Sequence, residues 1–217
     1  MAKTVIDLAK EYRTAIEAGS AKRVRALLRK GVKAHPLDIL GALLRKQSSL
    51  IPLLKEAGSD PDARDAFGRT ALVQAANFRP ASEVKILLEA GADPNKEQHT
   101  LLPLLLAAGN GNADSVKLLL EYGADVNKTQ WNGLTALTEA FRYGHHETVE
   151  LLVKAGADPW HKGPDGNDSF DLARKSERKD IRAILETVQR SDVKVHSKLD
   201  SGLNAKPAKK KRRASAA

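Results

Sequence analysis

Apolar residues recur along the chain in short groups that are separated by polar residues and glycine. Val116 with Leu119 and Leu120, and later Val149 with Leu152, follow the i, i+3, i+4 spacing of one helix face. Each group is followed by a glycine, where a helix commonly closes in a left-handed turn. The pattern predicts short amphipathic helices that each turn one apolar side inward.

These apolar groups belong to a repeat of about 33 residues. The segment 87–96, Leu-Leu-Glu-Ala-Gly-Ala-Asp-Pro-Asn-Lys, recurs at 119–128 and 151–159, and more loosely at 53–61. Its glycine falls at positions 58, 91, 123 and 156, at spacings of 33, 32 and 33 residues. A second motif, Gly-x-Thr-Ala-Leu followed by alanine, runs in register with the first. Two motifs in register indicate a repeat architecture.

Together, the two motifs resemble the ankyrin repeat, in which G-x-T-P-L-H-x-A-A is followed by L-L-x-x-G-A-D-x-N. The match is strong over residues 62–173 and weaker over residues 4–61. The resemblance implies an all-α solenoid of about six helix-turn-helix repeats with short β-hairpin fingers. It identifies the fold specifically, but it does not identify a partner.

We divide residues 1–189 into six units. These are an N-terminal cap repeat (4–31), a degenerate repeat (32–61), three regular repeats (62–96, 97–129 and 130–162) and a C-terminal cap repeat (163–189). We expect the first finger to be short, because only 27 residues separate Gly31 from Gly58. We also expect Pro52 to interrupt the second helix of the degenerate repeat near its start.

Several residues have local roles that need no family comparison. Thr70 and Thr135 can cap the first helix of a repeat with a side-chain oxygen, as Asp168 can in the last unit. Pro103 suits a first helical turn, where no amide hydrogen is needed. Small side chains on the first helices let adjacent helices approach closely (Ala75, Ala76, Ala107, Ala108 and Ala140).

The composition fits a soluble protein with an aliphatic core. Hydrophobic residues make up 41% of the chain and aromatic residues only 4%. There is no cysteine, which excludes disulfides, thiolate metal sites and a cysteine nucleophile. The longest apolar run, residues 101–108, is far shorter than the ~20 residues that a membrane helix needs. We expect an intracellular, cytoplasmic protein.

The positive charge is concentrated in residues 190–217, which contain nine Lys or Arg and two Asp, a net charge of +7 out of +9 for the chain. We expect this tail to be disordered, because the hydrophobic period stops. Three interpretations stay open: a nuclear localisation signal in a eukaryote, a phosphate-binding arm for nucleic acid, or a solubilising extension. The candidate signal is Lys209, Lys210, Lys211, Arg212 and Arg213.

The sequence predicts no catalytic site, no metal site and no cofactor. Asp60, Asp93, Asp125 and Asp158 recur once per repeat, which indicates a structural role, since a catalytic residue would appear once. His145 and His146 form the only close histidine pair, but adjacent helical residues point about 100° apart and no third ligand is apparent. No P-loop or G-x-S-x-G motif is present.

The few aromatic residues mark the predicted partner-binding surface. The resemblance places the fingers and the inner helices around a concave groove that contacts partners, and aromatic and Arg side chains are common in binding hot spots. The predicted set is Phe67, Arg69, Phe78, Gln98, His99, Asn110, Trp131, Arg142, Tyr143 and Trp160. The alternative is that Trp131 and Trp160 pack sideways on neighbouring fingers and stiffen the array.

These features predict a protein–protein interaction module that acts as an adaptor, an inhibitor or a regulatory subunit. The rival hypothesis is a nuclear or nucleic-acid-associated regulatory cofactor in which the basic tail sets location or contacts phosphate. A third possibility, an enzyme with an unfamiliar site, would require a non-periodic polar cluster in the groove. Asn77, His99 and Arg142 are too different in type to indicate one.

Overall fold

The computed structural model describes residues 5–97, 101–163, 165–169 and 171. Over these residues the chain forms ten α-helices and one short 3₁₀ turn, η1 (Ser48–Leu50). The helices follow one another as five pairs: α1 (Val5–Glu17) with α2 (Ala21–Arg29), α3 (Asp38–Leu44) with α4 (Ile51–Glu56), α5 (Ala71–Phe78) with α6 (Ala81–Glu89), α7 (Pro103–Gly109) with α8 (Ala113–Glu121), and α9 (Ala136–Tyr143) with α10 (His146–Lys154).

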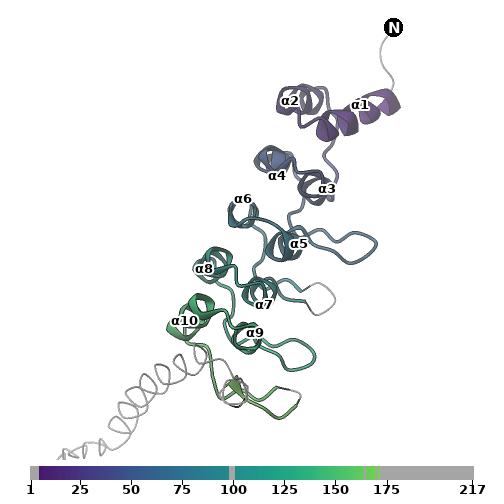
Figure 1. Ribbon diagram of the computed structural model, residues 1–217. Coiled ribbons are helices and arrows are strands. Elements are labelled where there is room, and N and C mark those ends of the chain that lie inside the picture. Colours follow the sequence, from purple (N-terminus) through teal and green to yellow (C-terminus); the bar gives the residue numbers. More distant parts are fainter. Residues whose placement is uncertain (1–4, 98–100, 164, 170, 172–217) are drawn as a thin grey trace, which may run out of the picture.

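Successive pairs stack side by side into an elongated array (Figure 1). The first helices α3, α5, α7 and α9 pack against one another in one row, and α4, α6, α8 and α10 form a second row. The connections between pairs project as fingers on the side of the first helices. This arrangement confirms the predicted all-α solenoid.

The fingers at residues 65–69 and 130–134 are tight hairpin turns closed by backbone hydrogen bonds. In the first regular repeat, the Asp65 amide donates to the Arg69 carbonyl at 3.2 Å, and the Gly68 amide donates to the Asp65 carbonyl at 2.8 Å. Residues 130–134 repeat this pattern. Within the described residues only Leu101 forms an isolated β-bridge, so the fingers are turns rather than extended strands.

The predicted N-cap residues Thr70 and Thr135 lie at the beginning of the first helices α5 and α9. Thr70 Oγ1 accepts the Val73 amide at 3.4 Å. Thr135 and Thr138 cap each other: Thr135 Oγ1 accepts the Thr138 amide at 3.2 Å, and Thr138 Oγ1 accepts the Thr135 amide at 2.9 Å. Helix α7 begins at Pro103, as expected. These contacts satisfy amides that have no partner within the helix.

The second helices end at left-handed glycines, also as predicted. Gly58, Gly91, Gly123 and Gly156 have φ angles of 93°, 86°, 87° and 90°. These angles lie in the left-handed region of backbone conformation, where the Cβ atom of any other residue causes steric strain, so glycine is favoured. The four glycines therefore mark equivalent corners of consecutive repeats.

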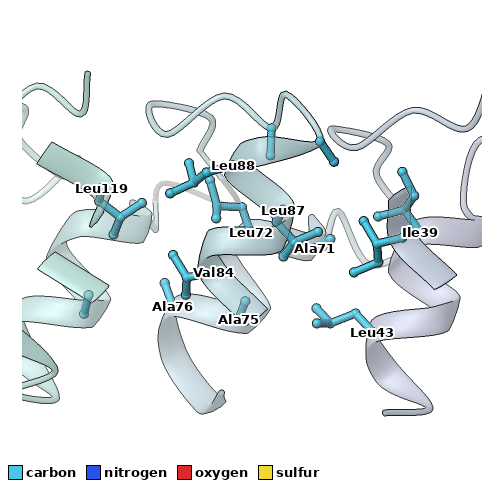
Figure 2. Packing of buried hydrophobic residues seen from close by; sticks show 14 of the residues in the cluster. Ile39, Leu43, Ala71, Leu72, Ala75, Ala76, Val84, Leu87, Leu88 and Leu119 are labelled. Atoms are coloured by element: carbon cyan, nitrogen blue, oxygen red, sulfur yellow. The ribbon is translucent and has the colours of Figure 1, made fainter. Parts of the chain in front are cut away.

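A continuous aliphatic core fills the space between neighbouring pairs. Figure 2 shows Ile39 and Leu43 of α3 pointing toward α5, with Leu72 and Leu87 in the next layer. All four side chains are fully buried. No helix pair can bury both of its faces alone, so each layer depends on its neighbours.

Pro52 lies near the start of the second helix of the degenerate repeat, as expected, but it begins the α-helical part instead of interrupting it. Helix α4 begins at Ile51, directly after η1, and Pro52 lies in its first turn. A proline there removes no helical hydrogen bond, because the first amides of a helix have no intrahelical acceptor. The proline thus starts a shortened helix instead of breaking a longer one.

Lys46 is the only non-glycine residue with a positive φ angle among the described residues, at 60°. It follows α3 where Gly19, Gly111 and Gly144 follow other first helices, with φ angles of 64°, 67° and 74°. We expect Lys46→Gly to raise the free energy of unfolding by about 0.5–1 kcal/mol, because the cost of a left-handed Cβ exceeds the entropy that glycine adds to the unfolded chain. Urea denaturation followed by circular dichroism measures this change, and a loss of stability would contradict it.

After α10 the structure describes only the start of the C-terminal cap repeat. Asp168 Oδ1 accepts the Asp171 amide at 2.8 Å, which is the predicted cap. The rest of the unit 163–189, and the tail 190–217 with its cluster Lys209–Arg213, lie outside the described residues. No described helix is long and apolar enough to cross a membrane.

Candidate partner-binding surface

Two fingers expose a large aromatic side chain at the turn. Phe67 is 69% exposed and Trp131 is 79% exposed. Phe67 is the third residue of the turn 65–68, and Trp131 is the second residue of the turn 130–133. The exposure of Trp131 does not favour sideways packing, because a side chain packed on a neighbouring finger would be shielded from solvent.

A second set of predicted residues lies at the ends of the first helices. Phe78, Asn110 and Tyr143 each follow the N-cap of their helix by eight residues, and Arg45 has the same position in the degenerate repeat. We call these four residues the helix-end row. Phe78 is 72% exposed and Tyr143 is 54% exposed. The row crosses four consecutive repeats, with one residue from each.

Contacts within the protein hold several of the predicted binding residues in place. Arg69 binds Asp65 through Nε at 2.7 Å, and its guanidinium lies 5.1 Å from the centre of the Phe67 ring. Asn110 Nδ2 donates to the Asn77 carbonyl at 3.0 Å. Preformed side chains lose less conformational entropy on binding than mobile ones.

The hydrogen bonds at Asp65 also affect its ionisation. Partial burial alone would raise the pKa of this carboxyl group, but bonds from the Arg69 side chain and from the amides of Arg69 and Phe67 lower the pKa below its ordinary value. Asp65 therefore stays ionised and continues to hold Arg69 beside Phe67 in mildly acidic solution.

Arg142 lies next to a buried carboxylate on α9. Its Nη1 lies 3.5 Å from Glu139 Oε1, and the Glu139 side chain is only 11% exposed. Tyr143 follows directly, and its ring centre lies 6.3 Å from that of His145. The end of α9 thus combines an aromatic ring with both signs of charge.

Trp160 has a different setting from the other aromatic residues. Counted from the preceding aspartate, it takes the position that holds Asn95 and Asn127 in the two repeats before it. Its amide donates to Asp158 Oδ1 at 2.9 Å, just as the Asn127 amide donates to Asp125 at 3.0 Å. Trp160 therefore lies at the base of its finger and not at the turn. Gln98 and His99 lie outside the described residues.

The aspartates and the histidine that the sequence offered as possible catalytic or metal-binding residues form hydrogen bonds within or between repeats. The carboxylates of Asp60, Asp93, Asp125 and Asp158 each accept the amide two residues later, at 2.8–3.0 Å. His145 Nε2 lies 3.0 Å from the Gly109 carbonyl oxygen, which links adjacent repeats. No group of three or more His, Cys, Asp or Glu in the described part of the chain could hold a metal ion.

One feature of the structure was not predicted from the sequence. A pocket of about 560 Å³ lies between α1 and α3, on the side of the first helices. At its edge the Tyr12 hydroxyl donates to Asp38 Oδ2 at 2.8 Å. Burial, together with this bond and the Asp38 charge, raises the pKa of Tyr12 above its ordinary value. The shortened first finger, which the sequence did predict, brings the connection 30–37 to this pocket.

Comparison with known proteins agrees with the repeat architecture. A family model described as ankyrin repeats (3 copies) matches residues 39–130 and 84–163. The chain is 36% identical over 135 residues to human SH3 and multiple ankyrin repeat domains protein 2, which covers 61% of this chain and 7% of that protein. It is 31% identical over 160 residues to the bovine mitochondrial disaggregase, covering 67% and 21% respectively.

A bacterial relative is closer in size. The putative ankyrin repeat protein YahD of Escherichia coli strain K12 is 30% identical over 123 residues, which covers 56% of this chain and 61% of that protein. The chain spans less than two thirds of the length of each of these three relatives. The family model alone covers more than half of the chain, and its matches together extend from α3 to beyond α10. The chain belongs to the ankyrin-repeat family.

Proposed function

We propose that this protein is a non-enzymatic adaptor, inhibitor or regulatory subunit that binds a partner protein through its concave side. Ankyrin repeats generally serve protein–protein interaction. The observation that supports a specific surface is the exposure of Phe67, Phe78, Trp131 and Tyr143, all on the fingers or at the ends of the first helices. Large exposed apolar side chains commonly mark interaction sites.

The proposed surface is rigid before binding. Its aromatic side chains stand on hairpin turns and helix ends that are fixed by hydrogen bonds, as at Asp65 and Asn110. A preformed surface needs little ordering on association, so a few aromatic residues can supply most of the binding energy. We place the protein in the cytoplasm, with the nucleus as the alternative if the basic cluster acts as a localisation signal.

Removal of aromatic side chains tests this surface. We expect Trp131→Ala and Tyr143→Ala to weaken partner binding by about tenfold or more each, since a hot-spot side chain contributes about 2 kcal/mol. The partner is first identified by co-purification and mass spectrometry, and affinity is then measured by biolayer interferometry. Tyr122→Ala is the matched control, because Tyr122 is an exposed aromatic residue at the end of the second helix α8. Equal affinity in all three variants would contradict the proposed surface.

The alternative function rests on the net charge of +7 in residues 190–217. In that case the tail would contact nucleic acid, and deletion of residues 190–217 would remove most of the salt dependence of binding. If the aromatic surface acts alone, the deletion leaves both the affinity and its salt dependence unchanged. Titration of the full chain and the deletion variant at two salt concentrations separates the two.

A further inference from the structure

At the pocket between α1 and α3, one position of the repeat lacks a side chain. The fourth residue after the helix N-cap is Gln74 in α5, Leu106 in α7 and Glu139 in α9, but it is Gly41 in α3. Gly41 lines the pocket. The only atom within 4 Å of a Cβ added there is Arg45 Nη1, at 3.3 Å, which is the end of a flexible side chain. The space is therefore open to a side chain from outside.

The charged groups around this space leave one net positive charge, once Asp65 is counted with its partner Arg69. Three carboxylates line the pocket, but each is already bonded: Asp38 to the Tyr12 hydroxyl and the His35 amide, Asp65 to Arg69, and Glu17 to Arg45. Arg13 and Lys33 also line it, and no described carboxylate forms an ion pair with either. The pair between Glu17 and Arg45 is long, at 3.8 Å, and both side chains are about half exposed. An incoming anion would meet two cations without an ion-pair partner, Arg13 and Lys33, and a weakly paired third, Arg45. The charge of Asp38, whose hydrogen-bond donors are neutral, offsets one of them.

The rest of the pocket surface is apolar. Ile16 and Leu40 form buried parts of the wall, and Leu44, one of the few exposed large aliphatic side chains, lies at its edge. A site with this lining fits a carboxylate that is carried on or beside an aliphatic group. Its volume of about 560 Å³ is large enough for one or two side chains.

The pocket is continuous with the proposed partner surface. Arg45 lines the pocket and is also the first member of the helix-end row, which continues to Phe78, Asn110 and Tyr143. Neighbouring helices lie about 8–10 Å apart, so three intervals span roughly 30 Å. An extended peptide advances about 3.3 Å per residue, so roughly nine residues would cover this distance.

We propose that the pocket binds an acidic side chain of the partner, presented by an extended segment that runs along the helix-end row. The inference rests on the proposed function and specifies the chemistry of the partner. Such a segment places Asp or Glu near Arg13 and Lys33, and places apolar side chains over Leu44 and Phe78. The basic tail of this chain is not a suitable occupant, because its net charge of +7 has the same sign as the unpaired pocket residues.

A random dodecapeptide phage library panned on the immobilised full chain is a direct probe. We expect the selected peptides to be enriched in Asp or Glu next to an aliphatic residue. Affinities of the best peptides, labelled with fluorescein, are then measured by fluorescence anisotropy. In the double variant Arg13→Gln with Lys33→Gln we expect binding to weaken about tenfold, because charge-assisted hydrogen bonds are lost.

Two further variants distinguish the pocket from general electrostatics. Lys22→Gln with Arg25→Gln removes the same charge from exposed positions of α2 that do not line the pocket, and should change affinity by less than about twofold. Gly41→Gln fills the pocket with the side chain that the next repeat carries. Because glutamine is a better helix former than glycine, this variant should fold at least as stably, yet bind the peptides about tenfold more weakly.

The outcomes separate this inference from the proposed function. If Tyr143→Ala weakens peptide binding while the Arg13, Lys33 and Gly41 variants do not, the partner surface stands and the acidic pocket is wrong. If neither group of variants has an effect, both proposals are wrong. Selected peptides without acidic enrichment, or the absence of any selected peptide, would also overturn the inference.

Discussion

Replacing Ala107 with leucine is expected to lower the free energy of unfolding by about 3 kcal/mol, at the upper end of the usual cost of overpacking. The fifth residue after the N-cap is alanine in four consecutive first helices: Ala42, Ala75, Ala107 and Ala140. All four are fully buried. Helix α7 packs against both α5 and α9, so a larger side chain at Ala107 must move at least one neighbour.

The same substitution is expected to make unfolding less cooperative. In a stacked array each repeat is stabilised mainly by its two neighbours, so a weak interface in the middle divides the array into two parts. Urea denaturation followed by circular dichroism should therefore show a lower midpoint and a shallower transition. Ala26→Leu, at an exposed position of α2, is the matched control and should have little effect. An Ala107→Leu variant as stable as this control would show that close helix approach is not required.

The sequence predicted the regular repeats well, because their signals are local and recur. A threonine N-cap at residue 70 or 135 and a glycine at residue 91, 123 or 156 each fix one helix boundary by a backbone requirement. Once two such motifs run in register, the stacking of helix pairs follows from the need to bury their apolar sides. The family comparison confirms this part.

The degenerate repeat was predicted less well, because its boundaries depend on context. Pro52 is compatible with either the start or the interruption of a helix. The 3₁₀ turn directly before Ile51 places Pro52 in the first turn of α4. Lys46 takes a position where other repeats use glycine, so the usual signal for the turn is missing. The pocket beside Gly41 could have been anticipated only by aligning the first helices from their N-caps, since the defining feature is a missing side chain.

The candidate surface was predicted from residue type more than from position. Phe67, Phe78, Trp131 and Tyr143 are exposed on the expected elements. Trp160 was grouped with them because it lies on a finger, although its distance from Asp158 places it with Asn95 and Asn127. Position within the repeat therefore indicates the setting of a side chain better than its membership of a finger does.

Asn95 and Asn127 form a ladder of hydrogen bonds between successive repeats. The equivalent position in the preceding repeat is Asp62. Asn95 Oδ1 accepts the Asp125 amide at 2.8 Å, while its Nδ2 donates to the Gly123 carbonyl at 2.9 Å. Asn127 makes the equivalent two bonds with the next repeat, at 2.8 and 3.1 Å. Asp62 accepts the Asp93 amide at 3.0 Å, but a carboxylate has no hydrogen to donate to the equivalent Gly91 carbonyl.

Asp62→Asn should therefore raise the free energy of unfolding at pH 7 by about 1–2 kcal/mol, through one added hydrogen bond and the removal of a partly buried charge. Burial raises the pKa of Asp62 above its ordinary value of 3.8, and the charges of Asp93 and Asp60 act in the same direction. The folded protein thus holds this proton more tightly than the unfolded chain does. Stability contributed by the proton is present below pH 3.8 and is lost as the pH rises through the higher folded pKa.

The gain from Asp62→Asn should accordingly be largest at neutral pH and should shrink toward pH 3, where the carboxyl group is protonated and can itself donate a hydrogen bond. Urea denaturation of both proteins at several pH values measures this difference. Asn95→Asp is the converse control: it removes the donor to Gly123 and adds a charge, so it should lower stability by about 1–3 kcal/mol at pH 7. If Asp62→Asn gave the same gain at pH 3 as at pH 7, the ionised carboxylate of Asp62 would not be what lowers the stability of the wild-type protein at neutral pH. A gain confined to neutral pH, with a loss in Asn95→Asp, would show that the amide hydrogen at this position joins successive repeats.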